Sequence, residues 1–301
     1  MLSQNTSRRD FLFIVCASVF WGTVGIANRA IYESTATNAL SLAFWRLAIA
    51  TPLFVLASWR FSGRRPFSIR HIKPRDLGVM LLMGGLQAIY QACYSAAIPY
   101  AGVTVSTLIA LCAAPVMVAL FSTLVAREGL TLATIIALIS AVGGTILLLL
   151  ARSHPGVENV SWPGILLALL AAGGYAGFIL CGRFVSGNYD PLHVNTVAFG
   201  VGALCLLLLG PSTGLVLAYP VWGWLLLLYL GCVPTALAYA LFQIGIRSLS
   251  ATVVSIVTLC EPFTAALLAW LIFREALSLL GLLGAGLLLV AMVLILLGPR
   301  K

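Results

Sequence analysis

The sequence predicts an all-α membrane protein in which ten transmembrane helices form two inverted-topology five-helix repeats around a central cavity. Charged residues make up only 8% of the 301 positions and hydrophobic residues 61%, whereas roughly a quarter of an ordinary globular domain is charged. Apolar runs of about 20 residues, long enough to cross the hydrocarbon layer of a bilayer, recur along the chain. An internal repeat divides these runs into two sets of five.

The apolar runs are separated by short connections with turn residues. Pro66 and Pro74, for example, flank a basic connection at 61–75. The first run follows Arg8-Arg9 and is longer than the apolar part of a signal peptide, so we expect a retained membrane anchor. The ten expected helices span 11–32, 38–60, 76–98, 103–125, 130–151, 162–182, 192–210, 220–245, 250–272 and 278–298.

The basic residues are distributed unevenly between the two sides of the membrane. When the N-terminus is placed in the cytoplasm, Arg46 lies within a run and only Arg29, Arg152 and Arg274 fall outside. The other thirteen of the 17 Lys and Arg residues fall inside, which is the positive-inside pattern. We therefore expect a multi-pass protein of the cell inner (plasma) membrane with both termini cytoplasmic. The net charge of +9 is thus topological and does not predict a nucleic-acid partner.

Cysteine and histidine usage argues against a metal or cofactor site. All seven Cys residues lie in expected helices, where Cys serves as a small apolar packing residue, and the three His residues are far apart. No GxxxxGK[ST] phosphate loop is present, and no nucleophile or paired carboxylates converge at one depth. We expect no metal, no cofactor and no enzymatic activity.

Two stretches of the first half recur in the second half with an offset of 147 or 148 residues. The repeat divides the chain into 1–152 and 153–301, each with five expected helices. The matching pairs are TVSTLIALC (104–112) with TVVSIVTLC (252–260), and PVMVALFSTLVAREGLT (115–131) with PFTAALLAWLIFREALS (262–278).

An odd number of helices per repeat makes the second copy enter the membrane from the opposite side. We therefore expect the Arg127-Glu128 pair inside and the Arg274-Glu275 pair outside. Inverted repeats are typical of secondary transporters, whose substrate site lies near the bilayer midplane between the halves. The alternative is a duplicated structural bundle without transport.

Five segments spread over the chain carry a family resemblance. They are FWGTVGIANR (20–29), AFWRLAIA (43–50), AGVTVSTL (101–108), Pro115 with the Arg-Glu that follows the fourth helix, and EPFTAALLAWLIFRE (261–275). In their order and spacing they resemble the EamA-type members of the drug/metabolite transporter superfamily, and the chain is most similar to the YddG-type aromatic amino-acid exporters. The resemblance implies a basket of ten helices, a central cavity and export of amino acids from the cytoplasm.

A polar and aromatic stripe runs along the third expected helix. Gln87, Gln91 and Ser95 recur every four residues, with Tyr90 and Tyr94 beside them. An amide in hydrocarbon without a partner costs about 2–7 kcal/mol, so these glutamines face either a wet cavity or a neighbouring helix. We predict substrate contacts from the glutamines and tyrosines of this stripe and of its counterpart in the second repeat. The counterpart residues are Thr235, Tyr239 and Gln243.

Aromatic residues also match between the first and sixth expected helices. Trp21 aligns with Tyr175 at an offset of 154, which also superposes Arg29 on Arg183. Small residues surround both aromatics and let helices approach closely. We predict Trp21 and Tyr175 as further substrate contacts.

Two charged residues lie near the middle of expected helices. Glu261 is roughly 16 Å and Arg46 roughly 12 Å from the start of its helix, in a core about 30 Å thick. Glu261 either binds a substrate ammonium group or a coupling proton, or pairs with Arg46 or caps backbone groups freed by Pro262, or is tolerated because it faces water. Arg46, Pro115 and Pro262 are predicted to have structural or gating roles, the two prolines as break points of their helices.

Together these features predict a secondary transporter that exports small amphipathic metabolites, foremost aromatic and other neutral amino acids, by alternating access. The expected partners are a small-molecule substrate, an amino acid, and the lipid bilayer, and we expect a monomer. The alternatives are a carrier of another solute such as a nucleotide sugar, which would need several basic residues in the cavity, and a channel. Proton coupling, uniport and exchange all fit the sequence.

Overall fold

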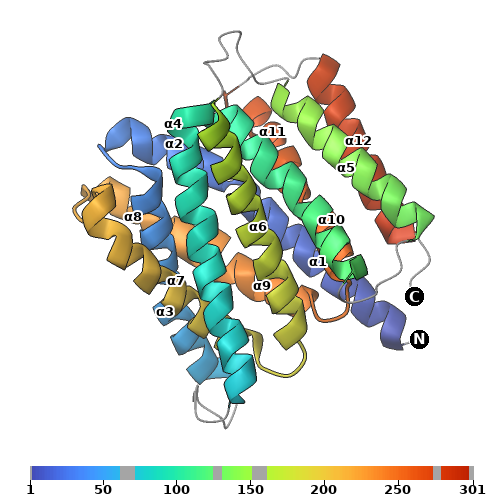
Figure 1. The fold of residues 1–301 in the computed structure, drawn as a ribbon, viewed down its shortest axis with the longest axis horizontal. Helices are drawn as coiled ribbons and strands as arrows, with labels where there is room; N and C mark the ends of the chain where they lie inside the picture. The colour runs from blue at the N-terminus through green and yellow to red at the C-terminus, as the bar shows by residue number, and fades with distance from the viewer. Residues whose placement is uncertain (1, 62–71, 125–130, 151–160, 274–278, 298–301) are drawn as a thin grey trace.

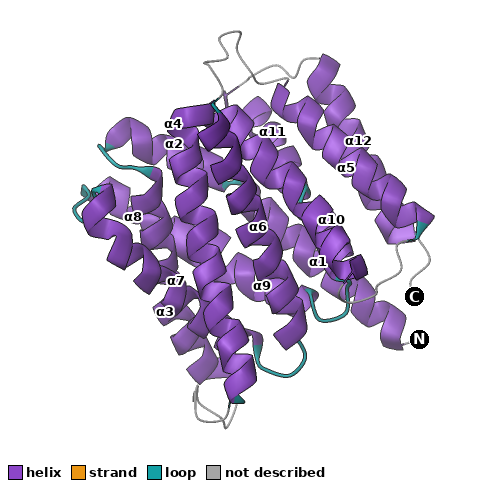
Figure 2. Ribbon diagram, in the orientation of Figure 1, coloured by secondary structure: helices purple, strands orange, loops and turns teal. Residues whose placement is uncertain are grey.

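The computed structural model describes residues 2–61, 72–124, 131–150, 161–273 and 279–297, which form helices and short connections without a named strand (Figure 2). The predicted Arg127-Glu128 and Arg274-Glu275 pairs lie outside these residues. The helices are α1 (Leu2–Gly22), α2 (Val24–Ser34), α3 (Ala39–Phe61), α4 (Pro74–Leu124), α5 (Leu132–Leu150), α6 (Trp162–Val185), α7 (Pro191–Thr213), α8 (Val221–Gly231), a π-helix (Cys232–Leu237), α9 (Ala238–Gly245), α10 (Ala251–Val257), α11 (Cys260–Phe273) and α12 (Leu279–Leu297).

All ten apolar runs expected from the sequence are mainly helical where the structure describes them, which confirms the all-α class. Six described segments are long and apolar enough to cross a membrane, and four are shorter apolar helices. The long segments are Arg8–Ser34, Ala39–Arg60, Pro74–Ile98, Trp162–Val185, Pro191–Ser212 and Val221–Gly245. The shorter ones are Ile109–Leu124, Leu132–Leu147, Ala251–Ala265 and Leu279–Ala291.

Helix α4 contains two of the expected spans and reverses direction between them. A straight helix of 51 residues would be about 76 Å long, more than twice the thickness of the hydrocarbon layer. The Tyr94 hydroxyl lies 2.7 Å from the Thr107 hydroxyl, although 13 residues of straight helix rise about 20 Å. Figure 1 accordingly shows α4 as two legs that meet at one end of the bundle.

Three of the expected spans are interrupted. The first is divided between α1 and α2 at Thr23, whose hydroxyl donates to Phe20 O at 2.7 Å. The eighth contains the π-helix, and the ninth is divided between α10 and α11 at residues 258–259. Interrupted helices are tolerated inside a membrane where other groups satisfy the backbone.

Prolines account for two of these interruptions: Pro262 for the one in the ninth span, and Pro234 for the π-helix in the eighth. Pro262 has no N–H to offer to the carbonyl of Thr258, which accepts from the N–H of Glu261 at 3.0 Å instead. The expected break near Pro262 is therefore present, four residues before it. At Pro115 no helix end is present, because α4 continues to Leu124; a helix can accommodate a proline by bending rather than by ending. The structural or gating role of Pro115 stays a prediction.

The first helix of each half packs against the other half of the chain. Helix α6 lies along α4, and α1 lies along α9 and α11, while α5 packs beside α12 (Figure 1). Gly174 of α6 allows the close approach, because a Cβ there would be 2.9 Å from Leu86 O and 3.0 Å from Tyr90 N. These exchanged contacts bring the two aromatic stripes to the middle of the bundle.

A polar network joins the ends of α4, α6 and α9 where α1 begins and α12 ends. The Tyr189 hydroxyl donates to Asp76 Oδ2 at 2.6 Å, and this bond raises the pKa of Tyr189 above its ordinary value of 10.0. Arg247 Nη2 donates to Tyr189 O at 2.7 Å, and Arg183 Nη1 donates to Arg247 O at 2.8 Å. This Tyr189 network, formed by Asp76, Arg183, Tyr189 and Arg247, connects residues 1–152 to residues 153–301 at this end of the molecule.

Substitution of Gly174 by Ala is expected to lower the thermal unfolding midpoint in detergent, because the added methyl meets backbone atoms that cannot move aside. Overpacking of this kind costs about 1–3 kcal/mol. Gly173→Ala is the matched control, since the nearest atom to a Cβ there is Met117 Sδ at 4.0 Å. Equal midpoints for the two variants would contradict this packing.

Candidate functional site

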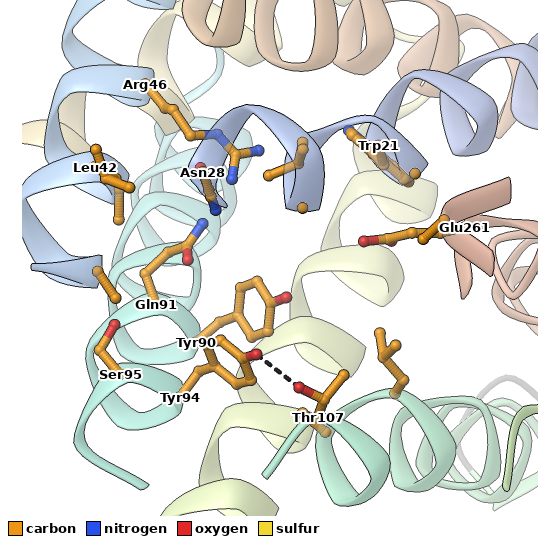
Figure 3. Close-up of a pocket in the computed structure, with 18 of the residues that line it drawn as sticks. Trp21, Asn28, Leu42, Arg46, Tyr90, Gln91, Tyr94, Ser95, Thr107 and Glu261 are labelled. Carbon is orange, nitrogen blue, oxygen red and sulfur yellow. Dashed lines mark hydrogen bonds between the residues drawn. The ribbon is translucent and has the colours of Figure 1, made fainter. Parts of the chain in front are cut away.

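A cavity of about 740 Å³ lies between α1, α2, α3, α4, α6, α9 and α11 (Figure 3). This volume is within the range of about 300–1,000 Å³ usual for small-molecule sites. Exposed Tyr32 and Glu33, at the end of α2, line its outer part, whereas buried Trp21 and Tyr239 line its deep part. The cavity thus extends inward from the end of the bundle opposite the Tyr189 network.

Aromatic rings form one wall and the floor of the cavity. Tyr90 lies 5.3 Å from Tyr175 and 6.3 Å from Tyr94, measured between ring centroids. Trp21 and Tyr239 are 4.8 Å apart by the same measure, and Phe242 lies behind them, 5.5 Å from Trp21. Such rings present flat apolar surfaces with polar edges, which suits a ligand that is both apolar and polar.

Arg46 of α3 and Glu261 of α11 both line the cavity, and Figure 3 shows their side chains entering it from different sides. Within the described part of the chain they form no ion pair with each other, and the Glu261 carboxylate accepts no hydrogen bond. The pairing of Glu261 with Arg46, one of the roles expected from the sequence, is therefore not found. The carbonyl freed by Pro262 is satisfied by the backbone of Glu261 rather than by its side chain.

Arg46 is held in place by a side chain from the other half of the protein. Its Nε donates to Thr235 Oγ1 in the π-helix at 3.2 Å. The same hydroxyl donates to Leu230 O at 2.7 Å, the carbonyl that Pro234 cannot satisfy because it lacks an N–H. The π-helix thus places the Thr235 hydroxyl where it can orient the Arg46 guanidinium.

Most of the residues predicted as contacts come together at this cavity, but two glutamines do not. Gln87 and Gln243 are buried outside its lining and bond between helices. Gln87 Nε2 donates to Tyr239 Oη at 3.2 Å, and Gln243 Nε2 donates to Gly182 O at 3.2 Å. The lining does include the predicted residues Trp21, Arg46, Tyr90, Gln91, Tyr94, Tyr175, Tyr239, Glu261 and Pro262. Pro115 is not among them.

Two polar residues of this site, Asn28 and Thr107, were not predicted from the sequence, and Thr235 was placed in the repeat without a role of its own. Asn28 and Thr107 line the cavity, and Thr235 orients Arg46. Each belongs to a pattern that was visible: Asn28 to FWGTVGIANR, Thr107 to TVSTLIALC, and Thr235 to the repeat partner of Gln87. Thr107 and Thr235 give no signal of a site in the sequence, because a Thr within an apolar helix usually bonds to its own backbone.

Both halves of the chain match one family model, over residues 9–150 and 162–297, and the model describes the EamA-like transporter family. The chain belongs to the EamA-like transporter family. It is therefore a membrane transporter, consistent with a multi-pass inner-membrane protein.

Relatives of this EamA-like transporter span nearly its whole length. It is 28% identical over 297 residues to the uncharacterized transporter YwfM of Bacillus subtilis, covering 96% of this chain and 94% of the relative. It is 25% identical to the uncharacterized inner membrane transporter YicL of Salmonella typhimurium, covering 99% and 98%. One solved crystal structure of a protein superposes with a TM-score of 0.79 at 21% identity over 95% of both chains, which supports the fold.

Ser95 and Ser106 provide a test of the cavity in this EamA-like transporter. Ser95 lines the cavity, whereas Ser106 is fully buried outside its lining. In a variant with the seven native cysteines replaced, Ser95→Cys is expected to react with a water-soluble maleimide and Ser106→Cys is not, as measured by mass shift. Equal reaction at both positions would argue against a cavity of this shape.

Proposed function

We propose that this EamA-like transporter is a secondary carrier that exports small amphipathic metabolites, foremost aromatic and other neutral amino acids, by alternating access. The observation that carries the proposal is that Arg46 and Glu261 both line the cavity, unpaired with each other, beside a wall of tyrosines, whereas Glu33 lines only its outer part. A zwitterion with an apolar side chain matches this arrangement in charge and in polarity.

Electrostatics favours a zwitterionic ligand over a singly charged one. Charges removed from water are costly unless a partner compensates them, so Arg46 and Glu261 are best satisfied together by a ligand that carries both signs. An aromatic side chain can then contact the rings of Tyr90, Tyr94 and Tyr175.

The alternative solutes fit the lining less well. A nucleotide sugar carries a diphosphate, which is usually neutralised by several cations. Among the described residues that line the cavity, Arg46 is the only Lys or Arg. A channel would need a continuous path, whereas the deep part of this cavity is filled by Trp21, Tyr239 and Phe242.

The transport cycle in this proposal uses two inverted halves. The exchanged packing of α1 and α6 supports a duplication, because equivalent helices contact equivalent partners. In the conformation described, the cavity extends toward one end of the bundle, and the Tyr189 network joins helices at the other. Export requires a second conformation in which the Tyr189 network opens and the outer part of the cavity closes.

Reconstituted proteoliposomes are expected to transport labelled tryptophan and phenylalanine, and threonine and methionine to a lesser extent, with saturation. Glu261→Gln should reduce this transport about 10- to 100-fold, because a charged hydrogen bond to the ammonium group is weakened. Measurements with and without a pH gradient separate proton coupling from uniport or exchange. Absence of saturable transport of all four amino acids would overturn the proposed substrate class.

The inverted arrangement is tested by the sidedness of two residues outside the described part of the chain. Cysteines introduced at Arg127 and Arg274 in a variant without native cysteines are expected to react with impermeant reagents from opposite sides of the membrane. Cysteines at Arg8 and Arg247 report the cytoplasmic side. Reaction of Arg127→Cys and Arg274→Cys from a common side would contradict inversion.

A further inference from the structure

We infer that Arg46, oriented by Thr235 of the π-helix, forms a subsite for the α-carboxylate of the substrate, and that the ammonium group of the substrate faces Glu261. The inference rests on the proposed function and adds to it the orientation of the substrate. It also assigns to Thr235 the role of a positioning residue for carboxylate recognition.

The π-helix fixes how the Thr235 hydroxyl can bond. Pro234 leaves the carbonyl of Leu230 without its usual backbone donor, and Thr235 Oγ1 donates its proton to that carbonyl at 2.7 Å. With the proton committed, the hydroxyl can only accept from other groups. It accepts from Arg46 Nε at 3.2 Å. A π-helical turn is rare and is frequently found at functional sites.

This bond leaves the far end of the guanidinium for a ligand. Arg46 has five N–H donors in a fixed fork, and Thr235 engages the one on Nε. The two Nη groups make no hydrogen bond to any residue that the structure describes. Figure 3 shows the guanidinium inside the cavity beside Asn28. Two parallel N–H donors match a carboxylate in a bidentate pair, which a single ammonium such as that of Lys cannot form.

An unpartnered acceptor lies at the same end of the cavity. Asn28 Oδ1 is buried and has no hydrogen-bond partner within the described chain, and its residue lines the cavity next to Arg46 in Figure 3. Buried polar atoms are normally satisfied, so this acceptor points to a polar ligand. It cannot bond to a carboxylate, which has no donor, but it can accept from the ammonium group that adjoins a bound α-carboxylate. Glu261, on another side of the cavity, is the acidic residue available to the ammonium group deep in the lining.

The subsite is built from both halves of the chain. Arg46 comes from α3 in the first half and Thr235 from the π-helix in the second. A ligand that lacks a carboxylate leaves the oriented guanidinium unpaired, which disfavours its binding. The carrier should therefore distinguish an amino acid from its amide, although the two share the same side chain and ammonium group.

The test measures binding of tryptophan, tryptophan amide and tryptamine to the purified full-length protein in nanodiscs. The wild type is expected to bind tryptophan at least about tenfold more tightly than the two analogues. Thr235→Val should lower the affinity for tryptophan about tenfold and leave the weak binding of the analogues nearly unchanged, so that the preference is lost. Thr235→Ser, which keeps the hydroxyl, should restore the preference.

Two further variants separate positioning from stability. Thr145→Val removes a buried hydroxyl that donates to Ala141 O at 2.9 Å outside the cavity lining, and it should leave the preference intact. Arg46→Lys keeps the charge but loses the fork, and it should reduce the preference even if Thr235→Val does not fold.

The outcomes distinguish this inference from the proposed function. If the wild type binds tryptophan and its amide equally, the carboxylate subsite is wrong while an amino-acid carrier remains. The positioning role of Thr235 is wrong if a folded Thr235→Val protein keeps the full preference. If the wild type binds none of the three compounds, the proposed substrate class fails, and the subsite fails with it.

Discussion

The structure depends on the need to satisfy every backbone polar group in a medium without water. Where the chain leaves regular helical bonding, it supplies a replacement from its own side chains or backbone. Thr23 donates to Phe20 O, Thr235 donates to Leu230 O, and the N–H of Glu261 bonds to Thr258 O. Each of these repairs lies beside the cavity, so the irregular backbone that opens space for a solute is also the backbone that places Trp21, Arg46 and Glu261 around it.

The exchanged packing of the two halves explains why the cavity is central. Because α6 lies along α4 and α1 lies along α9 and α11, the equivalent aromatics Trp21 and Tyr175 both reach the same space from different helices. Small residues such as Gly174 make this possible by allowing backbone-to-backbone contact. An arrangement in which each half packed only on itself would bury these rings in two separate cores.

Helix number and much of the lining could be predicted from the sequence, since apolar length defines the spans and a four-residue spacing places Tyr90, Gln91 and Tyr94 on one side of a helix. The same spacing wrongly added Gln87 to the lining. A polar stripe indicates that a residue avoids lipid, but whether its partner is a solute or another helix depends on the neighbour that packs there, here Tyr239. The role of Thr235 was equally hidden, because it arises from a π-helix and from contact with Arg46, 189 residues earlier in the chain.

The composition of the Tyr189 network affects how fast this end of the molecule can open and close. Its arginines donate to main-chain carbonyls at exposed positions, and Asp76 is bonded by a neutral phenol. When these contacts separate, water can take over every donor and acceptor, so that no charge is stranded in an apolar interior. In the proposed transport cycle a closure of this kind is readily reversible, which favours frequent switching between conformations over long residence in either one.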